Sequence, residues 1–375
     1  MIKRLVLLML LSTGLAILYW TDWGNSPTEV YQWQIPDGFP APNVPEDNPM
    51  SEAKVTLGKA LFFEPALSAN RAMSCSTCHI PEHAFAEPRQ TSSGSTGQMV
   101  RRNALALVNV GYNGSLTWAH NGLKTIEQQL LIPLFSEHPI EMGITGHTEE
   151  VLNRFQTEDY LALFEQAFGT REVLFDHIVK ALASYVRSLV SFNSRFDDYA
   201  YRGIDEALSP SELRGMELFF SERLECFHCH GGFNFTQSSQ HAFQQLDLKP
   251  FHNTGLYNVD GRGAYPEIDQ GLIEITLDSK DMGRFRAPTL RNIAQSAPYM
   301  HDGSLASLDD VIAFYAAGGL GNGIKSPLKS PFVAGFTLTP QEHEDLKSFL
   351  HSLTDDTFLR DPNHQAPINP PKVND

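Results

Sequence analysis

The sequence predicts a mainly α-helical protein whose two halves are related by internal duplication. Three kinds of segment recur in the same order in both halves, a pattern that chance seldom produces. At 375 residues the chain suits two domains of ordinary size, and its 42% hydrophobic residues suffice for two apolar cores. The recurring pairs are residues 58–63 with 215–220, 106–110 with 289–293, and 118–122 with 299–303.

The four cysteines all belong to two copies of the motif C-x-x-C-H. Two thiols at this spacing can add to the vinyl groups of haem, and the adjoining histidine can ligate the iron. A zinc site or two local disulfides would leave both histidines unexplained. We therefore predict two cytochrome c-like domains, each with one covalently bound c-type haem. The attachment residues are Cys75 and Cys78 with His79, and Cys226 and Cys229 with His230.

The first twenty residues predict export. Lys3 and Arg4 precede an apolar run that ends near Trp20, which is typical of a secretion signal or of a short uncleaved anchor. No later segment is long and apolar enough to cross a membrane, so contact with a bilayer is expected only through this segment. The formal net charge of -16 argues against nucleic acid as a partner, because phosphate binding needs clustered Lys and Arg.

The recurring segments and composition shifts divide the chain. An amphipathic helix is expected before each attachment motif, at residues 58–63 and 215–220. The Pro-rich stretch at 36–50 predicts an extended segment outside the core. The expected organisation is a leader at 1–20, a lead-in at 21–50, a first domain at 51–205, a second at 206–355 and a C-terminal tail at 356–375.

A further helix is expected after each of the recurring segments 118–122 and 299–303. Comparing these two helices indicates which residue each half can offer to the distal side of its haem. Ser307 is the expected N-cap in the second half, and Thr125 is its counterpart in the first. Counting eight residues from each cap places Pro133 opposite Tyr315. Proline has no donor atom for iron, so the first haem would be open while a phenol could cap the second. A core tyrosine is the alternative role for Tyr315, and Met300 is the competing ligand.

The chain resembles the bacterial di-haem cytochrome c peroxidase and MauG superfamily from about Val55 to Leu353. The similarity is carried by both C-x-x-C-H motifs and by the strings A-P-T-L-R-N at 287–292 and A-P-Y-M-H-D-G-S-L at 297–305. Shorter strings at 31–33, 38–40, 227–233 and 253–258 are similar to the MbnH-type MauG-like di-haem enzymes.

The resemblance implies a MauG-like second haem. Its distal ligand in the di-haem peroxidases is a methionine at the position of Tyr315, and in MauG it is a tyrosine. Many simple peroxidases carry a displaceable histidine sixteen residues after the first proximal histidine, but that position is Ser95 here. The first haem is therefore expected to be open without prior reduction. His83, nearby, is expected to be a surface or packing residue.

The resemblance also implies roles for other residues. A distal glutamate that moves the peroxide proton corresponds to Glu141, with Glu137 as a neighbouring alternative and Gln129 or Gln128 in support. Trp118 corresponds to a tryptophan that passes electrons between the haems. Calcium ligands correspond to Asn103, Ser296 and Pro298. MauG passes oxidising equivalents to its partner through a tryptophan where this chain has Leu224, so an outward relay here would need tyrosines such as Tyr257, Tyr265 or Tyr299.

We therefore expect a periplasmic enzyme that uses hydrogen peroxide to form high-valent haem iron and oxidises a protein partner at long range, with tryptophan to kynurenine as the implied change. The alternative is a di-haem peroxidase that reduces peroxide with electrons from a small cytochrome or copper protein. Pro133 disfavours a third class, an electron carrier without catalysis.

Overall fold

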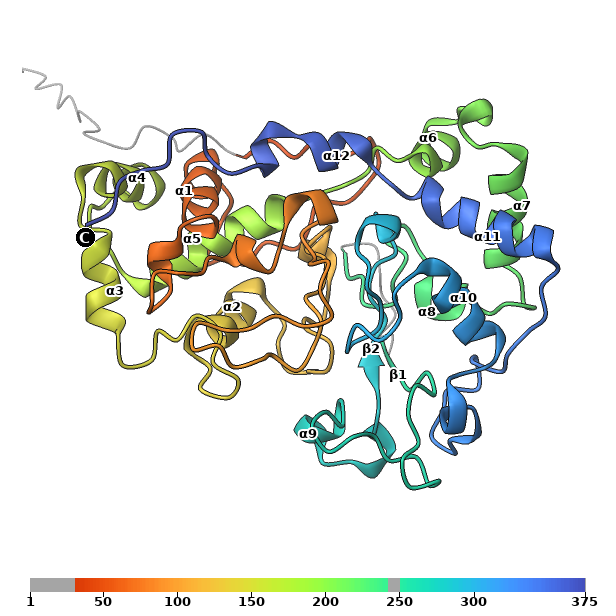
Figure 1. Cartoon of the computed structure of the whole chain (residues 1–375). Coiled ribbons are helices and arrows are strands. Elements are labelled where there is room, and N and C mark those ends of the chain that lie inside the picture. Colours follow the sequence, from red (N-terminus) through yellow and green to blue (C-terminus); the bar gives the residue numbers. More distant parts are fainter. Residues whose placement is uncertain (1–30, 242–249, 375) are drawn as a thin grey trace, which may run out of the picture.

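The computed structural model describes residues 31–241 and 250–374, so the expected leader lies outside the described residues. The protein is mostly helical, with two helical groups side by side and a smaller extension below the second (Figure 1). The first group comprises α1 (Glu52–Phe62), α2 (Ile126–Phe135), α3 (Thr148–Arg154), α4 (Glu158–Phe168) and α5 (Phe175–Ser188). The second comprises α6 (Arg195–Arg202), α7 (Pro210–Phe219), α8 (Phe227–His230), α10 (Leu308–Ala316) and α11 (Pro340–Ser352).

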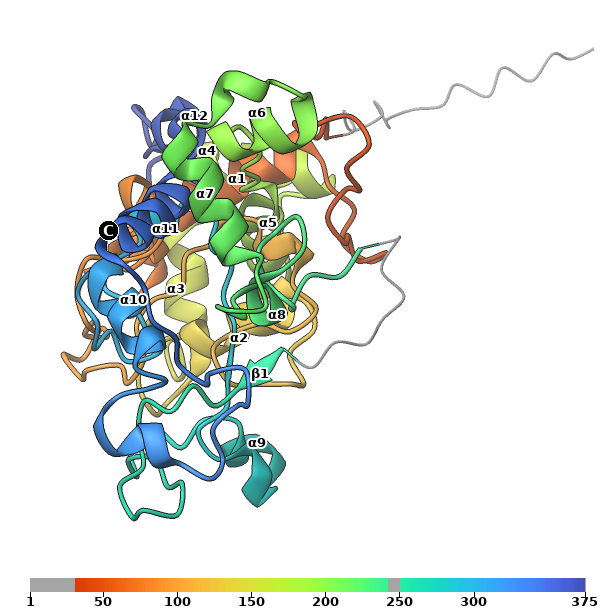
Figure 2. The ribbon, with the colours of Figure 1, turned by 90° about the vertical axis from the view of Figure 1, so that its right-hand side faces the viewer.

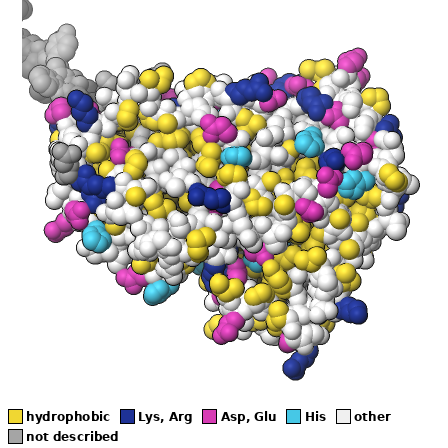
Figure 3. All heavy atoms as spheres, viewed as in Figure 1, with side chains coloured by type: hydrophobic (Ala, Val, Ile, Leu, Met, Phe, Trp, Pro, Cys, Tyr) yellow, Lys and Arg dark blue, Asp and Glu magenta, His cyan; other side chains and the backbone are white. Residues whose placement is uncertain are grey.

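The extension contains α9 (Ile273–Thr276) and an antiparallel pair of short strands, β1 (Phe251–His252) and β2 (Phe285–Arg286). It exposes apolar side chains, which Figure 3 shows at the lower end of the molecule. Ile268 is 73% exposed and Leu277 is 85% exposed. Within the described residues, no helix is long and apolar enough to cross a membrane.

The two halves repeat one helix packing. Helix α1 packs on α5 in the first half, and α7 packs on α11 in the second (Figure 2). A glycine lets the backbones approach at the same point in each pair. A Cβ atom on Gly58 would lie 2.0 Å from the carbonyl oxygen of Ala181, and one on Gly215 would lie 1.9 Å from that of Asp345. The repeated G-x-x-L-F-F segments therefore position both attachment motifs against a long helix.

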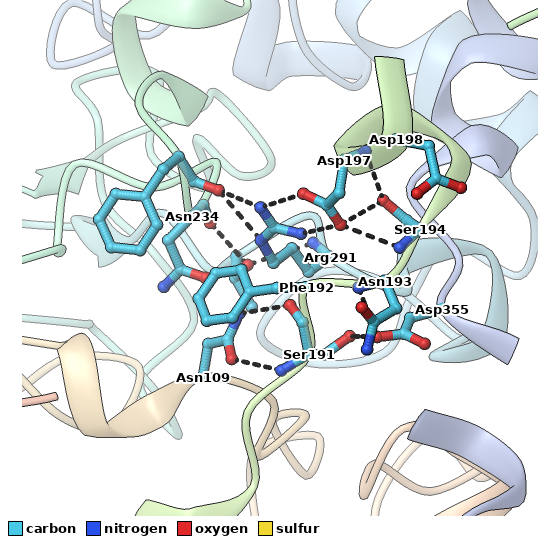
Figure 4. Close-up of polar contacts among 12 residues, drawn as sticks. Asn109, Ser191, Phe192, Asn193, Ser194, Asp197, Asp198, Asn234, Arg291 and Asp355 are labelled. Atoms are coloured by element: carbon cyan, nitrogen blue, oxygen red, sulfur yellow. Dashed lines mark hydrogen bonds and ion pairs between the residues drawn. The ribbon is translucent and has the colours of Figure 1, made fainter. Parts of the chain in front are cut away.

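A second repeated feature lies where the halves meet. Asn109 and Asn292 both adopt left-handed backbone, with φ of 55° and 57°, a conformation that asparagine tolerates well. Both side chains bind Ser191: the Asn109 amide donates to its carbonyl at 3.1 Å, and the Asn292 amide donates to its hydroxyl at 3.0 Å (Figure 4). Equivalent residues of the two halves thus hold the same linking segment.

A buried ion pair ties α6 to the second half. The side chains of Arg291 and Asp197 are both completely buried. The Nη1 and Nη2 atoms of Arg291 each lie 2.9 Å from one carboxylate oxygen of Asp197. The Ser194 hydroxyl donates to Asp197 at 2.6 Å, and the Nε atom of Arg291 donates to the Phe233 carbonyl at 3.0 Å, which completes the network (Figure 4). Phe196, beside Asp197, packs in the second core with Phe219 and Phe349. Residues just before 206 therefore contribute to the second core.

The C-terminal segment lies along the first half (Figure 1). It includes α12 (Asp356–Arg360), whose Phe358 is 3% exposed within the first core. Farther along, Lys372 accepts a hydrogen bond from Thr157 at 2.7 Å through its carbonyl, and Asn374 accepts one from Arg71 at 2.9 Å. The segment at 356–374 therefore stabilises the half that is more distant in sequence.

A third apolar cluster joins the halves, and we call it the seam cluster. Its buried members are Trp118, Ala119, Phe251, Leu256, Tyr265, Leu272, Phe285, Leu305 and Phe314. Beside it, Arg102 of the first half forms two 2.7 Å contacts with the carboxylate of Asp269 from the extension. Trp118 therefore lies in an apolar contact between segments far apart in the sequence.

Candidate functional site

Both motif histidines are held in the form that ligates iron. The Nδ1 atom of His79 lies 2.8 Å from the carbonyl oxygen of Phe85. That of His230 lies 3.1 Å from the carbonyl oxygen of Pro288. A carbonyl only accepts, so Nδ1 carries the proton and Nε2 is left with its lone pair. Burial lowers the pKa of His79 and lowers that of His230 to about 4, which keeps both imidazoles neutral.

A large cavity opens at the second motif. It has about 1680 Å³ of atom-free space, including its mouth, and Cys226, Cys229 and His230 line it. Most of its other walls are aliphatic or aromatic, which suits a flat apolar macrocycle. Arg286 also lines it, is buried, and has an Nη1 atom with no hydrogen-bond partner among the described residues. The donor set therefore fits haem, with Arg286 available for a carboxylate of that group.

Tyr315 and Met300 line this same cavity. Tyr315 lies near the end of α10, whose predicted N-cap Ser307 is confirmed by its bond from the Asp310 amide at 3.1 Å. Tyr315 is half-buried beside the cavity, and burial raises the pKa of its phenol. A phenol oxygen on the wall of this cavity is a donor atom that iron can use.

The counterpart helix in the first half contains Pro133 at the matching position. Its predicted N-cap, Thr125, is confirmed by the bond that it accepts from the Gln128 amide at 3.2 Å. The carbonyl of Pro133 accepts from the Met142 amide at 2.9 Å. The loop after α2 therefore folds back onto that helix, next to a residue that cannot ligate a metal.

Glu141 lies on this returning loop. Its carbonyl accepts from the Ser95 amide at 2.7 Å, and a Cβ atom on the neighbouring Gly94 would lie 1.7 Å from the Ile140 carbonyl oxygen. Burial raises the pKa of the Cys75 and Cys78 thiols, and the Glu141 carboxylate adds a smaller electrostatic contribution, which places it in the vicinity of the first attachment site. Burial raises the pKa of Glu141 itself.

The alternatives to Glu141 and Gln129, namely Glu137 and Gln128, differ from them in exposure and in hydrogen bonding. Glu137 is exposed. The Gln128 side chain caps α2, accepting from the Lys124 amide at 2.9 Å. By contrast, the Oε1 atom of Gln129 is buried and has no partner within the described part of the chain. His83 lies 3.2 Å from the Gln295 carbonyl oxygen, which gives it a bond between the halves.

Trp118 is fixed by both halves. Its ring is 9% exposed, and its indole nitrogen donates to the Asn103 carbonyl at 2.8 Å. From the second half, Arg286 donates its backbone amide to the Trp118 carbonyl at 2.7 Å and its Nε atom to the Thr117 carbonyl at 2.8 Å. The indole lies on the wall of the second cavity. This position suits a group that connects the two sites.

Asn103, Ser296 and Pro298 all line the second cavity. The Asn103 amide nitrogen donates to the Arg89 carbonyl at 3.0 Å, which turns its oxygen the other way. Within the described residues, this oxygen and the carbonyls of Ser296 and Pro298 receive no hydrogen bond. Free oxygens of this kind are what a hard cation such as calcium prefers.

Two residues at the site escaped the sequence reasoning. Arg286 directly precedes the A-P-T-L-R-N string. A positively charged residue between apolar neighbours was the feature of the sequence that could have indicated a role at the site. Asp302 follows His301 in the second seam segment, and it accepts a hydrogen bond from the Tyr257 hydroxyl at 2.6 Å. Nothing in the sequence pairs residues 45 positions apart.

Comparisons with known proteins agree on one family. The sequence profile described as di-haem cytochrome c peroxidase matches residues 52–206. The cytochrome-c peroxidase IdrP1 of Pseudomonas sp. strain SCT is 32% identical over 92% of each chain. The methylamine utilization protein MauG of Methylophilus methylotrophus is 31% identical, covering 89% of this chain and 91% of that protein.

A solved structure supports the same assignment. A MauG-like protein associated with microbial copper homeostasis is 44% identical, with a TM-score of 0.87, over 90% of this chain and all of that one. The di-haem peroxidase BthA from Burkholderia thailandensis shares the fold at 24% identity and a TM-score of 0.65. Duplicated attachment motifs, neutral proximal histidines and close relatives in both branches lead to one conclusion. The chain belongs to the di-haem cytochrome c peroxidase and MauG family, whose members are haem-dependent oxidoreductases that act on peroxide.

Proposed function

We propose that the protein is a MauG-like enzyme that reacts with hydrogen peroxide at an open first haem and oxidises a protein partner at long range. The observation that carries the proposal is the difference between two matching helices: α2 has Pro133 at the position where α10 has Tyr315. Bound haem supplies iron that peroxide oxidises and that exchanges single electrons with its surroundings. Each haem would belong to its own domain, with the junction before α6 because Phe196 packs in the second core.

Glu141 has the chemistry to cleave the peroxide bond. Its carboxylate takes the proton from the inner peroxide oxygen and returns it to the outer oxygen, so that water leaves. Burial disfavours the charged form and makes Glu141 a stronger base than an exposed glutamate. Gln129, buried with its amide oxygen unpartnered, would orient the peroxide or an intervening water.

The residues of the seam would connect the two sites. Trp118, in the seam cluster, would lose an electron transiently and so shorten each transfer step between the sites. Asn103, Ser296 and Pro298 would hold calcium, which would fix the Trp118 indole because that indole donates to the Asn103 carbonyl. Tyr315 would supply an oxygen ligand to the second haem and favour its oxidised states.

The partner would be a protein in the periplasm. This enzyme would enter the same compartment by export, directed by its N-terminal leader. We propose tryptophan as the oxidised residue, converted to kynurenine, which is the change that the resemblance to the MbnH-type enzymes implies. A second candidate is peroxide reduction with electrons from a small cytochrome or copper protein. This candidate is favoured by the 32% sequence identity to a cytochrome-c peroxidase. It is also favoured by Met300, a possible thioether ligand on the cavity wall.

One experiment separates these candidates. The diferric protein is mixed with stoichiometric peroxide, the iron is followed by Mössbauer and EPR spectroscopy, and a co-expressed partner is mapped by mass spectrometry. We expect both irons to respond without prior reduction and one partner tryptophan to gain the mass change to kynurenine. A low-spin, methionine-ligated second haem that turns over only after reduction would instead establish the simple peroxidase.

A further inference from the structure

We propose that Tyr257, paired with Asp302, is the surface station at which oxidising equivalents leave the seam cluster for the protein partner. This inference rests on the proposed function and adds to it an exit route. The Tyr257 hydroxyl donates to the Asp302 carboxylate at 2.6 Å, a short charge-assisted hydrogen bond. Both residues are partly exposed, so they lie where the protein interior meets solvent.

An aromatic path connects Tyr257 with the interior. Its ring centre lies 5.5 Å from that of Tyr265, in an edge-to-face arrangement. Tyr265 is 2% exposed, packs 5.9 Å from Phe285, and shares the seam cluster with Trp118. Phe285 in turn lines the second cavity. Aromatic rings therefore extend without interruption from the second cavity to the surface.

Of the three tyrosines that could carry an outward relay, Tyr257 has the partner that oxidation requires. A phenol that loses an electron becomes strongly acidic and must pass its proton to a base. Tyr265 donates to the amide oxygen of Asn253 at 3.2 Å, and Tyr299 donates to the Ile293 carbonyl at 3.0 Å. Neither of these carbonyl-type acceptors is a useful base. The Asp302 carboxylate is a base, and an oxidised phenol can pass its proton to it along the existing hydrogen bond.

Oxidation of Tyr257 is a coupled transfer of one electron and one proton. Tyr257 gives one electron inward to the haem centres that hydrogen peroxide has oxidised, and its hydroxyl proton moves to Asp302. The products are a neutral tyrosyl radical and a carboxylic acid. A partner side chain then returns one electron to Tyr257 while the proton moves back from Asp302. Two such cycles consume the two oxidising equivalents of one peroxide molecule.

The surroundings suit a protein partner. Val259, two residues beyond Tyr257, is 64% exposed, and the same extension exposes Ile268 and Leu277 (Figure 3). Apolar side chains of this kind on a surface favour contact with another protein. An indole or phenol of that partner would be the electron donor.

The test uses the full-length di-haem protein and three variants. Tyr257→Phe removes the oxidisable phenol, Asp302→Asn removes the base and keeps the shape, and Tyr199→Phe on α6 is the control, because it lies outside the seam cluster. Each is mixed with hydrogen peroxide without partner, freeze-quenched and examined by EPR for a tyrosyl radical. A nitroso spin trap followed by peptide mapping locates the radical independently.

We expect a radical and a trap adduct at Tyr257 in the wild type and in the control, and loss of both in Tyr257→Phe and in Asp302→Asn. The oxidised haem spectrum should form equally fast in all four proteins and should persist longer in the two variants. An unchanged radical in Tyr257→Phe, or adducts only at other residues, would overturn the exit route. Failure of peroxide to oxidise the wild-type haems would instead overturn the proposed function, so the two failures are distinguishable.

Discussion

Arg291 and Asp197 form a completely buried ion pair that holds α6 and the linking segment on the second half. Removing one partner of such a pair leaves an uncompensated charge in the interior. We expect Asp197→Ala to lower the free energy of unfolding by about 3–5 kcal/mol, measured by urea denaturation of the haem-loaded protein.

The neighbouring residue provides the control. Asp198 pairs with Arg202 at 2.8 Å, but both side chains are about one-third exposed. Asp198→Ala should cost at most about 1 kcal/mol, as exposed pairs do. Equal losses for the two variants would show that burial of the Arg291 pair does not dominate its energetics.

Glu141 predicts a pH dependence. Because burial raises its pKa, the carboxylate that accepts the peroxide proton is populated only as pH rises through that raised value. The second-order rate constant for peroxide should therefore increase with pH in the wild type. Glu141→Gln should lower it by about 10²–10⁴-fold and leave it flat with pH, in stopped-flow measurements. The exposed Glu137→Gln should behave as the wild type, and a pH rise that persists in Glu141→Gln would assign the base elsewhere.

The adjacent glutamines should give opposite results. Gln128→Ala breaks the capping box of α2 and should cost about 0.5–1 kcal/mol of stability with an unchanged peroxide rate. Gln129→Ala removes a buried polar group that faces no protein partner and should slow peroxide cleavage by about 10²-fold, with little change in melting temperature. Thermal denaturation and stopped-flow spectroscopy on both variants decide the matter. A slower peroxide reaction in Gln128→Ala alone would reverse the roles.

Tyr315 predicts the redox properties of the second haem. Tyr315→Met replaces an oxygen ligand with a thioether and should raise the reduction potential by about 0.1 V or more, since axial ligands set haem potentials over roughly 0.8 V. Spectroelectrochemical titration measures the change. Met300→Leu is the matched variant, because Met300 lines the same cavity, and it should leave the potential near the wild-type value. A large shift in Met300→Leu instead would identify the thioether as the ligand.

Much of the fold was predictable because its signals are local. Gly58 and Gly215 precede the attachment motifs in the same pattern, and each permits the same close approach of helices. The side chains of Thr125 and Ser307 each accept a hydrogen bond from the backbone amide three residues later, so each cap depends on only a few adjacent residues. The packing of Phe358 on the first core was not predictable, because it depends on residues far away in the chain such as Phe85, whose ring centre lies 5.9 Å from that of Phe358.

By itself, the sequence determined the covalent chemistry: four cysteines and two histidines in fixed motifs, the duplication, and the contrast between Pro133 and Tyr315. These follow from atom types and from spacing along the chain. Only the tertiary structure decided that the Gln129 amide oxygen is buried while Gln128 caps a helix, that Arg286 keeps a buried nitrogen without a partner among the described residues, and that Tyr257 meets Asp302. Burial and pairing arise when distant segments exclude water together, and neither is written in a local pattern.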